Sequence, residues 1–386
     1  MPIPASIKEI FRSLAYCVYR IFPKRNIAVV YGWPDFEDNT LALEQGLNRS
    51  DLSRIVLLVS GEPGGGGYSW GEKTLVVQKN SWRGLCYFLS ARYVFFTHRC
   101  FMFHFPPNVI SVNVWHGMPI KKIGWMLAGN RGYASKYALA TSDFWARVVD
   151  QSLQPFGQTL VTGLPRNDRL FTADKDFWAR LGLSSNIADK RVVGWLPTYR
   201  KSVTGEIRTD GLDSENVFGL AGITPEQLNA NLQQWGGFAI VKPHPMAKPV
   251  ACCQMSNLLI IDDEWLRSRA TSLYEILAQC DLLATDMSSV LVDYLVLDRP
   301  VIHLIADLME YRASRGFSIE PVEDYLAGPL VANAGELFTH LERMLRGEDS
   351  HRNHRRKMRA LFHRNPDAGA THRLLAALRV PATQTN

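Results

Sequence analysis

The sequence predicts an α/β fold built from two doubly wound halves that face each other across a cleft. Short runs rich in Val and Ile alternate with helical patterns, which is typical of parallel sheets covered on both faces. The chain of 386 residues is long enough for two ordinary domains. A more polar stretch at 164–189 separates a first alternating set from a second. We therefore expect an N-terminal domain over 26–165, a C-terminal domain over 190–386, and a separate basic helix within 1–25.

The expected strands and helices follow one another in a regular order. Runs with the composition of strands occur in the first half at 26–32, 54–60, 74–78, 93–97, 109–115, 136–143 and 159–163. The second half repeats the pattern at 191–200, 238–245, 257–263, 281–289 and 299–307. Helical spacing occurs at 39–49, 144–153, 272–279, 289–297 and 335–379. Each half is therefore expected to contain its own mostly parallel sheet.

The composition is that of a globular protein. Hydrophobic residues make up 46% of the chain and charged residues 21%, which excludes a disordered chain. The six cysteines have no C-x-x-C spacing, and His98 and His104 are interpreted as packing and surface residues, so neither a metal nor another cofactor is expected. No segment reaches the ~20 apolar residues of a membrane span, and charged residues interrupt the N-terminus where a signal peptide would lie. We expect the protein to stay in the cytoplasm.

The positive charge is concentrated at the two ends of the chain. Residues 341–380 contain ten Lys and Arg against four Asp and Glu, and residues 1–25 contain five against one. Basic ends on a mildly acidic body favour a negatively charged surface as partner. Apolar residues recur at helical spacing within 4–23, at Ile7, Ile10, Phe11, Leu14, Val18, Ile21 and Phe22. This stripe fits either a helix docked on its own domain or a helix lying in a membrane interface.

His116 is the first candidate for chemistry. It follows a strand pattern, Gly117 permits close approach or unusual backbone angles, and Pro119 ends the strand pairing. Lys121 and Lys122 supply positive charge a few residues later. A histidine beside cations suits a general base that acts on an anionic substrate. The alternative is a core histidine bonded to backbone.

A second histidine, His244, also follows a strand pattern. Ligands gather at the carboxyl ends of strands in open α/β sheets. His244 stands between two prolines, with Lys242 two residues before it, so its backbone is held as a preformed site requires. The alternative is a turn histidine at the surface.

The stretch from Asp286 to Asp293 has the pattern of an anion site. Asp286 ends a strand pattern, and Ser288 and Ser289 stand where a helix would begin. Asp293 lies four residues after Ser289, on nearly the same face of that helix. A helix N-terminus favours an anion, because its first N–H groups are free and its dipole is positive. Simple capping by the serines explains the pattern equally well.

Two turns bounded by Gly or Pro carry arginines. One contains Arg166 and Asp168, and the other contains Thr198 and Arg200. The guanidinium fork matches a phosphate group. Either turn is also compatible with a structural role, in which Asp168 caps a helix.

Several of these motifs together resemble one known family. They are "VWHGMPIKKIG", "TSDFWA", "TGLPRNDRL", "LPTYR", "VKPHP" and the long run from "DLLATDMSSVLVDYLVLDRPVIHL" to "DLMEYRASRGF". In order and spacing they resemble the CDP-glycerol glycerophosphotransferases that build teichoic acid and related capsule polymers, from about residue 26 to about residue 345. The resemblance implies a GT-B-like fold, with the donor bound mostly by the C-terminal domain and the acceptor by the N-terminal one. It also implies transfer of glycerol phosphate from CDP-glycerol to a hydroxyl of a lipid-linked saccharide or growing polymer, with release of CMP.

The resemblance also assigns roles to residues. His116 matches the catalytic base, and His244 matches a histidine that contacts the donor phosphates. Ser288 and Ser289 match phosphate contacts, and Asp293 matches a residue near the glycerol or the ribose. The full set of implied substrate contacts is Trp115, Gly117, Pro119, Lys121, Arg166, Pro197, Thr198, Lys242, Ser288, Ser289 and Asp293. Met287 departs from the family, which often has Tyr or Glu there.

Three other interpretations remain open at this point. The nearest is a sister enzyme that uses CDP-ribitol or another nucleotide-activated polyol or sugar on the same fold. A different class is a non-catalytic protein that binds nucleic acid through "HRNHRRKMR" at 351–359, although no nucleic-acid motif is present. A third is a membrane scaffold. We expect CDP-glycerol, a lipid-linked acceptor and the anionic inner face of the cell membrane as partners, and the short length favours a single-addition or compact capsule transferase.

Overall fold

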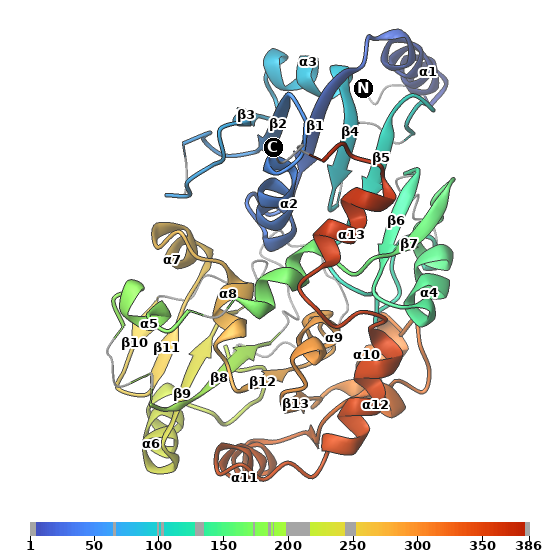
Figure 1. Cartoon of the computed structure of the whole chain (residues 1–386). Helices are drawn as coiled ribbons and strands as arrows, with labels where there is room; N and C mark the ends of the chain where they lie inside the picture. The colour runs from blue at the N-terminus through green and yellow to red at the C-terminus, as the bar shows by residue number, and fades with distance from the viewer. Residues whose placement is uncertain are drawn as a thin grey trace. The chain divides into compact units, whose positions relative to one another are not determined.

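The computed structural model describes residues 5–64, 67–98, 100–101, 104–127, 135–172, 174–183, 187, 189–197, 217–243 and 252–382 (Figure 1). Its internal contacts divide the chain into two compact units. Unit 1 comprises Met1–His116, Ile123–Asp168 and Ala368–Asn386, and unit 2 comprises Gly117–Lys122 and Arg169–Asp367. Each unit has its own sheet and its own core, as the alternating pattern predicted.

The described part of unit 1 contains one sheet of seven parallel strands, in the order β3-β2-β1-β4-β5-β6-β7. The strands are β1 (Arg25–Tyr31), β2 (Arg54–Val59), β3 (Thr74–Gln78), β4 (Ala91–Phe96), β5 (Ile110–Asn113), β6 (Tyr137–Ala140) and β7 (Gln158–Val161). The direction of winding reverses between β1 and β4. In doubly wound folds, ligands bind beyond the carboxyl ends of the strands at such a reversal.

Helices of unit 1 begin at side chains that bond their first free N–H groups. Glu37 caps α2 (Asp38–Asn48), Ser81 caps α3 (Trp82–Ser90) and Ser142 caps α4 (Asp143–Leu153). The other helical segments assigned to this unit are α1 (Ala5–Ile21), η1 (Gly124–Met126) and α13 (Ala370–Ala377), while η2 (Pro165–Phe171) crosses the boundary.

Unit 2 contains a sheet with the same winding. Its order in the described residues is β10-β11-β9-β8-β12-β13-β14, parallel except for β10, which runs antiparallel to β11. The strands are β8 (Arg191–Leu196), β9 (Gly237–Val241), β10 (Cys253–Gln254), β11 (Leu258–Ile260), β12 (Leu282–Thr285), β13 (Val301–Leu304) and β14 (Leu330–Val331). Here the winding reverses between β8 and β12, so the carboxyl ends of these two strands are the corresponding ligand position.

The helices in the described part of unit 2 are mostly short. They are α5 (Phe177–Arg180), α6 (Pro225–Trp235), α7 (Asp263–Ser268), α8 (Leu273–Ala278), α9 (Val290–Tyr294), η4 (Leu295–Leu297), α10 (Leu308–Ser314), η5 (Val322–Tyr325), α11 (Ala334–Leu345) and α12 (Arg352–Phe362). The central strands of both units, such as β1, β9 and β12, are mostly buried aliphatic runs, because helices cover both faces of a parallel sheet.

The N-terminal helix α1 docks on unit 1 through a residue outside the predicted stripe. Tyr19 is fully buried and its ring stacks on Phe88, 5.3 Å between centroids. Among the stripe residues, Leu14, Val18 and Ile21 are instead exposed by 60%, 41% and 79%, and Phe22 is half-buried. The side chains of Ile7, Ile10 and Phe11 lie outside the part that the structure describes. No helix in the described residues has the length and apolar character to cross a membrane.

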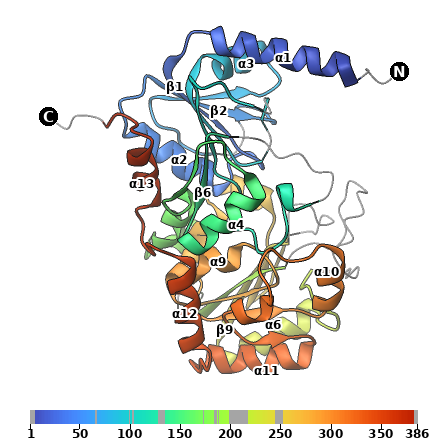
Figure 2. The ribbon, with the colours of Figure 1, turned by 90° about the vertical axis from the view of Figure 1, so that its right-hand side faces the viewer.

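The C-terminal region differs from its prediction. Residues 335–379 have helical spacing throughout, but the structure breaks them into α11, α12 and α13. The last of these belongs to unit 1, where it packs against α2 (Figures 1 and 2), whereas we expected it in the C-terminal domain. This contact joins residues more than 300 positions apart, and local periodicity carries no information about such a pairing.

Candidate active site

His116 lies beyond the carboxyl end of β5, as the strand pattern predicted. Trp115, just before it, has φ 55°, a left-handed backbone conformation that is uncommon for a bulky residue. The Trp115 N–H donates to Asn113 Oδ1 at 3.1 Å, and the Trp115 ring stacks on the His116 ring at 4.3 Å between centroids. His116 itself is exposed, so its imidazole is accessible to a substrate.

Two rings from neighbouring loops extend this pair. His98, which follows β4, lies 5.7 Å from the Trp115 ring and 5.4 Å from the His116 ring, between centroids. Trp33, which follows β1, lies 5.5 Å from the His98 ring. We call Trp33, His98, Trp115 and His116 the aromatic row.

Sequence reasoning missed two members of the aromatic row, because it interpreted His98 as packing and did not consider Trp33. A signal was present: both residues follow strands, and the carboxyl ends of neighbouring parallel strands meet at one edge of a sheet.

Asn39, at the start of α2, joins the loop of Trp115 to the turn of Arg166. Its side chain is fully buried, and its Nδ2 donates to the Trp115 carbonyl oxygen at 3.2 Å. Its Oδ1 accepts from the Arg166 N–H at 3.1 Å. One side chain therefore sets the relative position of the segments that carry His116 and Arg166. Sequence reasoning missed Asn39 because both contacts are distant along the chain.

Glu37, the N-cap residue of α2, is a titratable group beside Asn39 and Arg166. It is half-buried, and its carboxylate accepts from the Thr40 N–H at 2.8 Å and the Asn39 N–H at 3.1 Å. Burial raises the pKa of Glu37 to about 7, although the nearby Arg166 guanidinium and these hydrogen bonds act in the opposite direction. The carboxyl group therefore changes charge near neutral pH. Arg166 is buried beside it.

Asp168 has the structural role that the sequence left open. Its two oxygens accept from the Ala370 N–H at 2.8 Å and the Thr371 N–H at 2.9 Å. It thereby bonds the first N–H groups of α13. Burial raises the pKa of Asp168, against the hydrogen bonds from Thr371 and Ala370.

The segment after His116 belongs to unit 2. Lys121 forms an antiparallel bridge with Phe317, and the Lys122 N–H donates to the Gly316 carbonyl oxygen at 3.2 Å. The Ser318 hydroxyl donates to the carbonyl oxygens of Pro119 and Ile120.

Three predicted substrate contacts in this segment differ in accessibility. The Lys121 Nζ lies 4.8 Å from the centroid of the Tyr311 ring, a cation–π contact. Lys121 is half-buried, and Gly117 and Pro119 are buried.

The reversal point of the second sheet brings Pro197 near the stretch from Asp286 to Ser289. Pro197 follows β8, and the Thr285 hydroxyl at the end of β12 donates to the Leu196 carbonyl oxygen at 2.7 Å. Ser288 and Ser289 are half-buried at the start of α9, as predicted. The Ser288 hydroxyl accepts from the Val290 N–H at 3.4 Å, a long capping bond.

Asp293 is fully buried, and its Oδ2 accepts a 2.6 Å hydrogen bond from the Tyr274 hydroxyl. Lys242, which follows β9, is 6% exposed and its Nζ lies 2.9 Å from Asp263 Oδ1. Both predicted substrate contacts therefore have partners within unit 2. His244, Thr198 and Arg200 lie outside the described residues. Among the residues that are described, no group of three or more His, Cys, Asp or Glu side chains is arranged to hold a metal ion.

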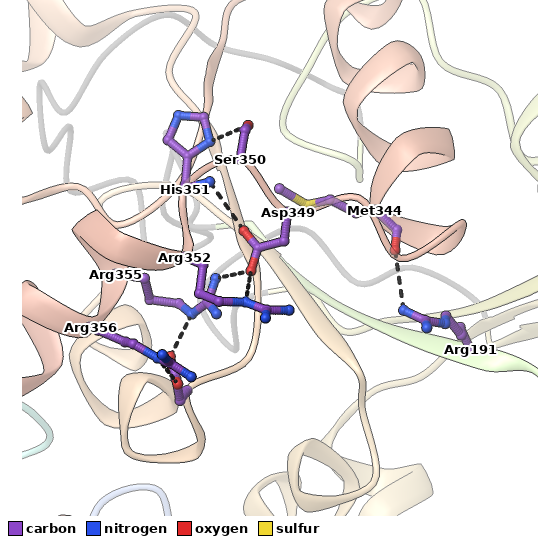
Figure 3. A network of polar contacts seen from close by, with 9 residues as sticks. Arg191, Met344, Asp349, Ser350, His351, Arg352, Arg355 and Arg356 are labelled. Atoms are coloured by element: carbon purple, nitrogen blue, oxygen red, sulfur yellow. Dashed lines mark hydrogen bonds and ion pairs between the residues drawn. The ribbon is translucent and has the colours of Figure 1, made fainter.

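Three arginines of α12 are engaged by carboxylates of unit 2 (Figure 3). Arg355 is 2% exposed, with Nη1 2.6 Å from Asp349 Oδ2 and Nε 3.0 Å from Asp298 Oδ1. Arg356 Nε lies 2.9 Å from Asp298 Oδ2, and Arg352 Nε lies 3.7 Å from Asp349 Oδ2. Partial burial opposes ionisation, but the arginine hydrogen bonds hold the pKa of Asp298 below its usual range. Much of the basic run at 351–359 therefore fastens α12 to its own unit.

Two doubly wound α/β units, each with polar residues beyond the carboxyl ends of its strands, define a GT-B-like fold of the kind that nucleotide-dependent transferases use. The chain belongs to the CDP-glycerol:poly(glycerophosphate) glycerophosphotransferase family, whose sequence profile matches residues 14–379. This confirms the resemblance drawn from the motifs and extends it at both ends.

Named relatives and a solved structure agree with this membership. The chain is 28% identical over 267 residues to the teichoic acid glycerol-phosphate transferase of Staphylococcus aureus, covering 62% of this chain and 63% of that protein. It is 25% identical over 304 residues to the teichoic acid ribitol-phosphate polymerase TarK of the same species, covering 70% and 54%. The chain thus spans about half to two thirds of these relatives. The wall teichoic acid polymerase TagF, solved after a soak with CDPG, superposes with a TM-score of 0.75 at 17% identity, covering 97% of each chain, which supports the fold.

Proposed function

We propose that this chain moves glycerol phosphate from CDP-glycerol to a hydroxyl of a lipid-linked saccharide or growing teichoic acid or capsule polymer, and releases CMP. The observation that carries the proposal is the family match over 14–379, together with an accessible His116 beyond the carboxyl end of β5. An accessible imidazole at that edge of a doubly wound sheet is suited to act on a bound substrate.

The reaction requires a positioned nucleophile and stabilised phosphate oxygens. The acceptor oxygen forms a bond to the phosphorus of the glycerol phosphate group, and the bond from that phosphorus to the CMP oxygen breaks. His116 takes the acceptor proton, and CMP leaves with the electron pair. The stacked Trp115 ring holds the imidazole in place.

Donor binding falls to residues beyond the strands of unit 2. In this proposal His244, Lys242, Ser288 and Ser289 hold the diphosphate, and Pro197 and Thr198 line the donor beside them. When the diphosphate binds, the Lys242 ammonium group pairs with the phosphates as well as with Asp263, since a diphosphate carries more charge than one carboxylate.

The remaining predicted contacts act beside the donor and the base. Arg166 contributes a guanidinium from the turn that Asn39 fixes. Asp293, held by Tyr274, supports the segment that faces the glycerol or the ribose. Gly117, Pro119 and Lys121 shape the segment that follows the base.

A ribitol-phosphate transferase is the second candidate. The specific observation in its favour is that TarK, matched over 70% of this chain, is a ribitol-phosphate polymerase. The two donors differ only in the length of the polyol, so the choice depends on the shape of the pocket.

We also propose that the chain works in the cytoplasm, on the inner face of the cell membrane, because its acceptor carries a lipid. The exposed Leu14, Val18 and Ile21 of α1, with Arg20 exposed beside them, suit an anionic bilayer surface. Binding of nucleic acid is not expected.

The test is CMP release from CDP-glycerol, with CDP-ribitol and a UDP-sugar in parallel and a membrane lipid extract as acceptor. A positioned base contributes about 10²–10⁴-fold, so His116→Ala should lose that much rate. His104→Ala, at an exposed histidine of the same unit, is the matched control and should keep full activity. Near-full activity of His116→Ala would rule out His116 as the general base. CMP release from CDP-ribitol alone would favour a ribitol-phosphate transferase.

A further inference from the structure

The aromatic row continues well beyond the base. The His116 ring touches the Trp115 ring, and both lie within 5.7 Å of the His98 ring, which leads on to Trp33 at 5.5 Å. These rings come from the loops after three strands, β1, β4 and β5, which are neighbours in the sheet. Four rings from three loops thus form one surface that ends at the candidate base.

Trp33 presents this surface to the outside. Its side chain is 42% exposed, although a large aromatic side chain gains free energy from burial. His116 at the other end is also exposed, and Trp115 between them is half-buried. An exposed run of rings of this kind is a feature of surfaces that bind a ligand.

The loop that carries Trp33 is held rigidly. The Trp33 N–H donates to Thr97 Oγ1 at 3.0 Å, which ties it to the end of β4. On its other side, the buried Lys79 donates to the Gly32 carbonyl oxygen at 2.8 Å and pairs with Asp35 at 2.9 Å. The backbone that carries the Trp33 ring is thus held from both sides, so little conformational entropy of this loop is lost when a ligand binds.

We propose that the aromatic row binds the saccharide ring of the acceptor by stacking. This inference rests on the proposed function, in which His116 takes the proton of an acceptor hydroxyl. Whatever lies on His98 and Trp33 while that hydroxyl reaches His116 is the adjoining part of the acceptor. A sugar ring has a face of C–H groups that packs on an aromatic face, whereas a linear polyol phosphate has no such face.

The test compares two acceptor probes with the same alkyl chain: octyl N-acetylglucosaminide, which has a sugar ring, and octyl glycerol phosphate, which has none. The full chain and its Trp33→Ala variant are titrated with each probe by calorimetry and assayed for transfer from CDP-glycerol. Trp33→Ala should raise the Kd and KM for the sugar probe about tenfold, the loss expected for one stacking contact. The values for the ringless probe, kcat and the KM for CDP-glycerol should stay within about twofold.

Two further variants serve as controls. Trp125→Ala removes a tryptophan of the same unit that is 44% exposed and outside the aromatic row, and it should behave as wild type. Trp33→Leu keeps apolar bulk in the loop without an aromatic face, and it should show the loss for the sugar probe even if the alanine variant unfolds.

Equal effects on both probes, or no effect on either, would overturn the inference. If Trp33→Ala instead raised the KM for CDP-glycerol, the aromatic row would bind the cytosine ring of the donor, which also stacks on tryptophan. If wild type released no CMP with either probe or with the membrane lipid extract, the proposed function would fail, whereas the calorimetric comparison would still decide whether the row binds a sugar.

Discussion

At the scale of single residues, the site depends on Trp115 and the polar groups that hold it. A left-handed conformation at a bulky residue costs on the order of 1–3 kcal/mol and persists only where its surroundings impose it. Asn113 holds its N–H and Asn39 holds its carbonyl oxygen. The strained turn aims His116 beyond the sheet edge, which is the position that a base acting on a bound acceptor requires.

Glu37 predicts a pH dependence of stability. Its pKa in the folded state is about 7, above the ordinary 4.5 of an unfolded chain, so the folded state holds the proton more tightly. Its contribution to the free energy of unfolding is therefore complete below about pH 4.5 and is lost as the pH rises through 7. The difference in melting temperature between wild type and Glu37→Gln should fall from pH 5 to pH 8.

The glutamine variant keeps one acceptor oxygen for the cap of α2 and removes the titration. Asp51→Asn, at an exposed carboxylate of the same unit, serves as the control and should show no such trend. A difference between wild type and Glu37→Gln that stays constant across this range would contradict the assignment.

At the scale of elements, α2 and α13 approach closely at Gly46. A Cβ built on Gly46 would lie 2.4 Å from Thr371 Cγ2, closer than real atoms pack. Alanine normally stabilises a helix interior by about 1 kcal/mol relative to glycine. Here we expect Gly46→Ala to destabilise unit 1 by about 1–2 kcal/mol, because the two helices must separate. Chemical denaturation followed by circular dichroism measures this change.

The double variant Gly46→Ala/Thr371→Ser tests the cause. Serine lacks the methyl group that the new Cβ would meet, so the volume at the contact is conserved. The double variant should be more stable than Gly46→Ala alone, while Thr371→Ser by itself should lose about 1 kcal/mol for its buried methyl group. Additive losses would mean that the two helices do not meet at these residues.

At the scale of the whole molecule, the C-terminal helices α11 and α13 belong to different units. Leu374 of α13 is fully buried in unit 1, and Leu341 of α11 is fully buried in the core of unit 2. Truncating either leucine to alanine should cost about 2–5 kcal/mol. Hydrogen exchange should show that Leu374→Ala lowers protection of β1–β7 and that Leu341→Ala lowers protection of β8–β14.

This pair of variants controls for the chemistry of the substitution, because both remove the same atoms from equally buried positions. If Leu374→Ala lowered the protection of β8–β14 instead, α13 would stabilise unit 2, which would contradict its assignment to unit 1. A loss spread evenly over both sheets would mean that the units unfold together.

The sequence by itself determined the class of fold and the position of His116. Buried parallel strands are continuous runs of Val, Ile and Leu, so they are readable locally, and the residue that ends such a run lies at the carboxyl edge of its sheet. The motifs also indicate the family without any knowledge of the tertiary structure. Ser288 and Ser289 were placed at the start of a helix for the same local reason.

Only the tertiary structure decided which distant segments meet. The contact of Trp33 with His98 and of His98 with Trp115, the bridge from Asn39 to Arg166, and the return of α13 to unit 1 each join residues far apart along the chain. Spacing within the sequence reports the face of one helix or strand, and it does not report the partner of that face. The stripe of α1 illustrates the difference: its spacing predicted a helix, but the buried contact shown within unit 1 is made by Tyr19, while Leu14, Val18 and Ile21 of the stripe are exposed.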